Sequence, residues 1–150
     1  MPSPIAAILD NRAFGILMRV VVTFPFWAAG LAKIADFNAT LAEMAMFNLQ
    51  PAAVIAVATI ITQITGSALV IHGRHAWLGA GWLAVFTLLT IPLVHAFWRF
   101  QGEEAVVHMH VAVEHIGMCA GLALAAVQAH WVRTVRDETV LAPRLAAARG

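Results

Sequence analysis

Four long apolar runs restrict the fold of this chain more than any other feature of its sequence. A helix needs about 20 mostly apolar residues to cross the hydrocarbon core of a bilayer, and runs of this length lie at 13–32, 52–71, 76–97 and 105–130. They take up most of the 150 residues, of which 61% are hydrophobic. The core of a soluble domain of this size does not contain so many long apolar runs. The sequence therefore predicts an all-α integral membrane protein, a four-helix bundle in one domain.

The charges between the runs predict the orientation in the membrane. An even number of spans places both termini on one side, together with the short HGRH turn at 72–75. Cytoplasmic segments are enriched in Lys and Arg, and six arginines fall on the side of the termini, against Lys33 and Arg99 on the other side. We therefore expect cytoplasmic N and C termini in a bacterial inner membrane. The six arginines are Arg12, Arg74, Arg133, Arg136, Arg144 and Arg149.

The segments outside the runs differ in character. The HGRH turn is short enough to make the second and third runs a close antiparallel hairpin. The connection at 33–51 is long enough for a short interfacial piece. The polar tail at 131–150 is expected to be a loose, solvated end, or alternatively to lie on an anionic leaflet.

Polar residues interrupt each of the four runs near one level of the bilayer. At about 1.5 Å rise per residue, Arg19, Gln63, Thr87 and Glu114 come to similar depths. A buried arginine costs at least about 2.5–3.5 kcal/mol in a membrane unless it is paired, and Glu114 is its expected partner. Two interpretations stay open. The pair could only fix which helices are neighbours, or it could line a substrate or proton site.

A second polar cluster is expected at the outer end of the third and fourth runs. Imidazoles there could ligate metal or haem, relay protons or hydrogen-bond a quinone ring, or they could simply be solvated at the membrane interface. His108 and His110 stand at i and i+2, so they point to different sides of a helix, unlike the i, i+4 pairs of helical zinc sites. No metal site is predicted, and haem b is a weaker expectation than quinone. The cluster consists of His95, Trp98, Arg99, His108 and His110.

The sequence does not support nucleic-acid binding or cysteine chemistry as functions. The net charge is only +1, and no basic stripe is interleaved with aromatics, so nucleic acid is not an expected partner. The single cysteine, Cys119, lies in an apolar run and cannot form a disulfide or a thiolate metal site within one chain. The lipid bilayer is the partner that the composition predicts.

Two stretches of the sequence resemble a known family. LMRVVVTFPFWAAGLAKIADF combines an intramembrane Arg with a Gly and a Lys at the end of the run. QITGSALVIHGRHAWLGAGWLAVFTLLTIPLVHAFW has a polar residue followed by Gly, a Gly-x-Arg turn and a His-x-x-Trp ending. Both are similar to the DoxX family of small four-helix membrane proteins. The matching positions are Arg19, Gly30, Lys33, Gly66, Gly73, Arg74, His95 and Trp98.

The resemblance also carries expectations and departures. Similar members are linked to thiosulfate:quinone oxidoreductase and to thiol redox complexes at the membrane, and more distant relatives act as assembly chaperones or cargo receptors. The family usually has a Glu where this chain has Gln63, and the HMHVAVEHIG segment is richer in histidine and acid than the family usually shows.

Two functions are therefore expected as alternatives. In the first, the chain is a subunit of a bacterial redox or respiratory complex that handles quinone or protons, and as an enzyme it would be a quinone-linked oxidoreductase subunit that needs a partner. In the second, it is a non-catalytic adaptor or assembly factor. A partner subunit or a homo-oligomer is expected under both. In the redox subunit, Arg19 and Glu114 hold the polar layer. His95 with His108 or His110 contacts the quinone, and Trp98 lies beside them. Lys33 and Arg99 attract an anionic donor.

Overall fold

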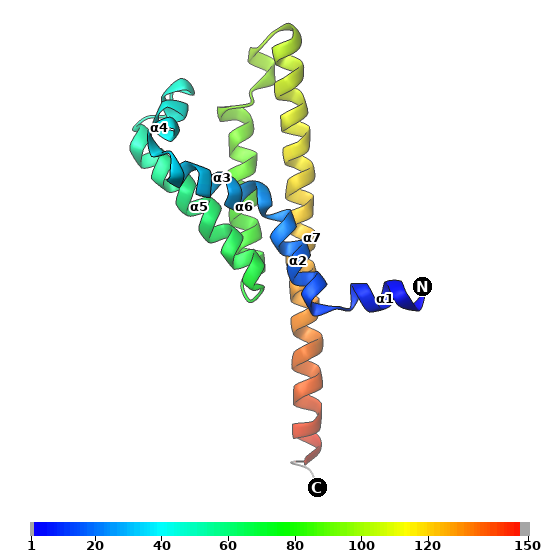
Figure 1. The fold of residues 1–150 in the computed structure, drawn as a ribbon. Coiled ribbons are helices and arrows are strands. Elements are labelled where there is room, and N and C mark those ends of the chain that lie inside the picture. The colour runs from blue at the N-terminus through cyan, green and yellow to red at the C-terminus, as the bar shows by residue number, and fades with distance from the viewer. Residues whose placement is uncertain (1, 148–150) are drawn as a thin grey trace.

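The computed structural model describes residues 2–147, with side chains described for residues 2–135. All regular elements in this part of the chain are helices (Figure 1). In chain order they are α1 Ser3–Leu9, α2 Arg12–Val22, α3 Phe24–Ala35, α4 Phe37–Met46, α5 Ala52–His72, α6 Ala76–Leu93, the 3₁₀ turn η1 Phe97–Arg99, and α7 Gly102–Ala147.

Three segments are long and apolar enough to cross a membrane, namely Ala52–His72, Ala76–Arg99 and Gly102–Val135. The bent pair α2–α3 makes a fourth if it counts as one span. Large apolar side chains cover the outside of these helices, as a hydrocarbon environment requires. The chain is therefore a multi-pass membrane protein, as its composition predicts.

The first apolar run is not the single helix that its hydropathy predicts. It forms α2 and α3, which are bent by 55° at Thr23. Pro25 lies in the first turn of α3, where a backbone N–H has no helical acceptor, whereas in one continuous helix its missing N–H would leave the carbonyl of Val21 without a helical donor. The Thr23 hydroxyl donates to the carbonyl of Arg19 at 2.7 Å, and so satisfies an acceptor at the bend. The first apolar run is therefore helical, as predicted, but it is broken into two helices, which still count as one span if the bent pair crosses the membrane as a unit.

The helices α5 and α6 form the predicted antiparallel hairpin. Its turn begins at Gly73, which has a φ of 87°, a left-handed conformation that favours glycine. Further into the hairpin, Gly79 lies directly against the α5 backbone, because a Cβ placed there would lie 2.6 Å from the carbonyl oxygen of Gly66. The absence of a side chain at this point lets the two backbones approach each other closely.

The core lies where α3, α5, α6 and α7 meet. Phe26, Val70, Ala80, Leu83 and Leu122 form a buried cluster there. In Figure 1, α7 runs along the whole bundle, α6 lies beside it and α3 crosses toward α5. The elements α4 and η1 lie at the same end of the bundle, and α1 projects sideways from the bundle beyond the start of α2.

The last helix is longer than expected. The apolar run predicts a span at 105–130 and a polar tail beyond it, whereas α7 is continuous from Gly102 to Ala147. The side chains of Arg136 and Arg144 and the whole of Arg149, which contribute to the predicted cytoplasmic charge, lie outside the described residues.

Candidate functional site

A pocket of about 510 Å³ opens between α3, α4, α5, α6 and α7. Its walls are mostly apolar, with Phe26 and Met44 among them. The polar groups in these walls include Lys33, Gln63 and His95, which the sequence analysis singled out. A largely apolar concavity with a few convergent polar groups is the usual form of a small-molecule site. We refer to this feature as the central pocket.

Oε1 of Gln63, which lines the central pocket, is buried without a hydrogen-bond partner. His115 lines the same pocket and its Nδ1 is also buried, and the His115 ring contacts the backbone of Val111, one turn earlier on α7. Thr87 differs, because its hydroxyl donates to the carbonyl of Leu83 at 2.8 Å. Buried polar atoms in proteins are nearly always hydrogen-bonded. The pocket therefore presents an unused acceptor on Gln63, together with the ring of His115, on otherwise apolar walls.

Three histidines gather at the end of the pocket next to η1. Nδ1 of His95 lies 3.1 Å from Nδ1 of His108, a hydrogen-bonding distance at which one ring must donate to the other. The rings of His95 and His115 meet edge to face, with centroids 5.3 Å apart. Phe100 stacks on His108 with a centroid distance of 4.1 Å. The bend after α6 and the i, i+7 spacing of His108 and His115 on α7 bring these side chains together.

The structure separates the remaining outer residues from this cluster. His110 and Arg99 are exposed, and Trp98 is 57% exposed on η1. His110 lies two residues from His108, so its side chain leaves α7 on a different side. His115 was not among the site residues expected from the sequence, although it follows His108 by seven residues and so lies on the same face of α7. The seven-residue spacing was the signal that could have found it.

The contacts among the histidines bear on the expectations for metal and haem. No group of three or more His, Cys, Asp or Glu side chains in the described part of the chain is arranged to hold a metal ion. His95 and His108 contact each other through Nδ1, the ring nitrogen that faces the partner imidazole in each case.

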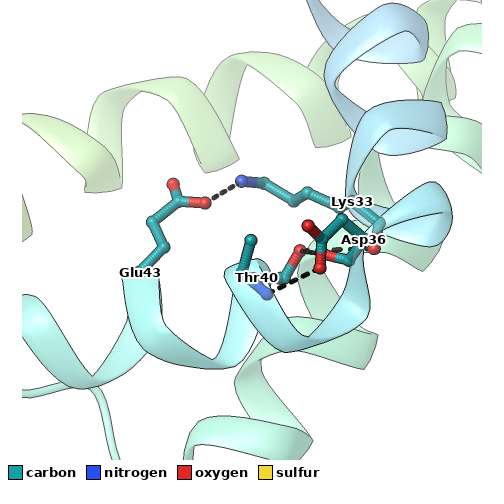
Figure 2. Close-up of polar contacts among 5 residues, drawn as sticks. Lys33, Asp36, Thr40 and Glu43 are labelled. Carbon is teal, nitrogen blue, oxygen red and sulfur yellow. Dashed lines mark hydrogen bonds and ion pairs between the residues drawn. The ribbon is translucent and has the colours of Figure 1, made fainter.

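Lys33 forms an ion pair with Glu43 of α4, and both residues line the central pocket. Figure 2 shows how this pair joins the end of α3 to α4. Asp36 caps α4 by accepting from the backbone N–H of Ala39 at 2.9 Å. The Thr40 hydroxyl is 3.2 Å from the Lys33 carbonyl. The expected role of Lys33 was to attract an anionic donor, but its charge is compensated within the chain by Glu43.

The Lys33–Glu43 pair is expected to hold α4 against the pocket. In a double-mutant cycle with Lys33→Met and Glu43→Gln, we expect a coupling free energy of about 1 kcal/mol. The Lys33 side chain is 15% exposed and the Glu43 side chain 41% exposed, so water and salt screen the pair only in part. The measurement is thermal unfolding in detergent, together with hydrogen exchange of residues 37–46. Additive effects of the two substitutions, with unchanged exchange in α4, would contradict this role.

The predicted pair between Arg19 and Glu114 is not formed. The only ion pair among the described side chains is Lys33–Glu43. Nε of Arg19 donates to the carbonyl of Gly15 at 3.3 Å, and its guanidinium lies against Gly73 in the α5–α6 turn. Glu114 is exposed on α7. The expectation is wrong because α7 turns the face that carries His108 and His115, and not the face of Glu114, toward the other helices.

Comparison with known families gives a match that covers the first part of the chain. The DoxX family model matches residues 15–96, which run from α2 to the end of the α5–α6 hairpin and include more than half of the chain. The chain belongs to the DoxX family. Neither the curated proteins nor the solved structures gave a match to the chain. The DoxX match ends just after His95, so His108 and His115 on α7 lie beyond it.

Proposed function

We propose that this DoxX protein is a membrane subunit of a bacterial redox complex and that its central pocket binds a quinone. The observation that carries the proposal is the buried, unpartnered Oε1 of Gln63 in an otherwise apolar pocket that His95 and His115 also line. A flat apolar ring fits these walls, and in its reduced form a ring hydroxyl can donate to Oε1 of Gln63. When bound, a quinone supplies two-electron, two-proton chemistry.

Gln63, His115 and His95 have different roles in the proposed quinone binding. Gln63 carries both amide donors and a carbonyl acceptor, so it can bond to a ring carbonyl or to a ring hydroxyl. His115 offers a nitrogen whose role depends on its tautomer. His95 lines the pocket and is in contact with His108, so the two rings can pass a proton from the pocket toward η1.

The proposed topology has four spans, with α2–α3 as one bent span and both termini in the cytoplasm of a bacterial inner membrane. Arg12 and Arg74 are exposed on the side of the termini, and the acidic Glu103 and Glu104 begin α7 on the other side. This asymmetry follows the positive-inside rule. The four spans then form one small bundle around the central pocket.

A partner chain is part of the proposal. Glu114 is exposed on a membrane-spanning helix, where a carboxylate facing lipid is costly. A partner subunit or a second copy that covers this face of α7 removes that cost. In this proposal the same partner delivers the electrons.

Quinone extraction from the purified full-length protein tests the proposal. We expect stoichiometric quinone in the wild type and its loss in His95→Ala, because His95 lines the pocket and contacts both other histidines. His110→Ala is the matched control, since this exposed histidine lies near the cluster but outside the pocket.

The alternative is a non-catalytic adaptor whose buried polar groups only fix the helix packing. Wild-type protein without quinone, together with normal assembly of the partner complex in His95→Ala, would favour the adaptor. A Soret band in the reduced-minus-oxidised spectrum would instead assign haem to the histidines.

A further inference from the structure

A second hollow, of about 450 Å³, lies at the opposite end of the bundle from the histidine cluster. It is formed by the α5–α6 turn, the start of α6 and the part of α7 that passes them. We call it the basic groove. Its side chains include Arg74, Trp77, His130, Trp131 and Arg133.

The groove is held together by a contact between its two walls. Nη1 of Arg133 donates to the backbone carbonyl of Arg74 at 3.4 Å, which ties α7 to the turn. This contact places one arginine on each side of the hollow. The left-handed Gly73 forms part of its surface, and the guanidinium of Arg19 lies against the same glycine.

The positive charge around the turn is not balanced by the described acidic side chains. Arg74 and Arg19 have no carboxylate within 4.0 Å among residues 2–135, where the single ion pair is the distant Lys33–Glu43. Among the residues whose side chains the structure describes, none that lines the groove is acidic. A fixed cluster of guanidinium groups is complementary to phosphate, which can accept two parallel hydrogen bonds from each arginine.

The side chains around these arginines suit a lipid headgroup better than a soluble anion. Trp77 is 68% exposed and Trp131 is 64% exposed, so two indole rings stand on the surface beside the arginines. Tryptophan is typical of the level at which lipid headgroups meet hydrocarbon. The rest of the lining is small and apolar, with Ala76, Ala126 and Val127, and gives acyl chains a surface to follow along α6 and α7.

We propose that the basic groove binds the phosphate headgroup of an anionic phospholipid. Basic hollows between transmembrane helices on the cytoplasmic side are suited to such headgroups. Arg74 and Arg133 hold the phosphate, Trp77 and Trp131 flank the glycerol region, and the acyl chains lie against α6 and α7. The proposal is independent of quinone binding, because the groove and the central pocket share no lining residue.

Native mass spectrometry of the full-length protein, titrated with lipids of matched acyl chains, tests the site. We expect phosphatidylglycerol to bind at least tenfold more tightly than phosphatidylcholine. Arg74→Gln and Arg133→Gln should each weaken phosphatidylglycerol binding about fivefold, because each removes one charge near the membrane surface. Arg74→Lys keeps the charge and should retain most of the affinity. Phosphatidylcholine binding should not change.

Arg99→Gln is the matched control, since Arg99 is an exposed arginine at the other end of the bundle. An equal loss in Arg99→Gln would show general charge attraction and overturn the site. Unchanged binding in both groove variants would also overturn it. Inorganic phosphate is the competing ligand, and its displacement of the lipid at low concentration would reassign the groove to a soluble anion.

Discussion

Replacing Gly79 with alanine is expected to lower the free energy of unfolding by about 3 kcal/mol, the upper part of the range for overpacking a tight interface. The new Cβ would lie 2.6 Å from the Gly66 carbonyl oxygen and 3.0 Å from the backbone nitrogen of Val70. Backbone atoms of a neighbouring helix cannot rotate away as a side chain can, so the α5–α6 hairpin has to open. The measurement is the thermal unfolding midpoint in detergent, supported by the yield of folded protein.

Gly81 provides the control for this prediction, because it lies two residues further along the same helix and nothing lies within 4 Å of a Cβ built there. Gly81→Ala removes a flexible residue from α6 without a clash and should stabilise the protein by up to about 1 kcal/mol. Equal effects of the two substitutions would mean that helix propensity, and not the close approach of α5 and α6, determines the result.

The positions of the spans were predictable because length and hydropathy alone determine whether a helix can cross a bilayer. The helix α5, at Ala52–His72, agrees with the predicted 52–71 almost to the residue. The break at Thr23 was not predictable in this way, because the run from 13 to 32 is apolar on both sides of it. A proline is compatible with either a kinked helix or a broken one. The packing of α3 across α5 decides between them, and that contact is not visible in a local pattern.

The candidate site was only partly predictable, for a reason that lies in α7. This helix has two polar faces, one with His108 and His115 and the other with His110 and Glu114, and small residues accompany both. Helical spacing separates these faces correctly but does not say which one the other helices cover. Ala112 and Leu122, both buried, mark the covered face as that of His115. The expected Arg19–Glu114 pair points instead to the face of Glu114, because an arginine buried in a membrane is expected to need a carboxylate partner.

Replacing Gln63 with methionine is expected to raise stability while it removes quinone binding. Gln63 is only 6% exposed and its Oε1 has no partner, so the empty pocket keeps an unsatisfied buried group that costs about 1–3 kcal/mol. Methionine is similar in length and has no such requirement. We expect the unfolding midpoint to rise, by about 3 °C for each kcal/mol. Quinone affinity should fall at least tenfold, as expected when a buried hydrogen bond to a ligand is lost.

The opposite signs of these two effects separate a binding residue from a structural one. If Gln63 only held neighbouring helices together, Gln63→Met would lower stability and leave any bound quinone in place. Gln128 supplies the control, because its Oε1 is also buried without a partner but the residue lies against Gly15 on α2, outside the central pocket. Gln128→Met should therefore raise the unfolding midpoint without changing quinone affinity. A fall in affinity of the same size in Gln128→Met would contradict the assignment of Gln63, because the loss would then follow from repacking of the bundle and not from a contact inside the pocket.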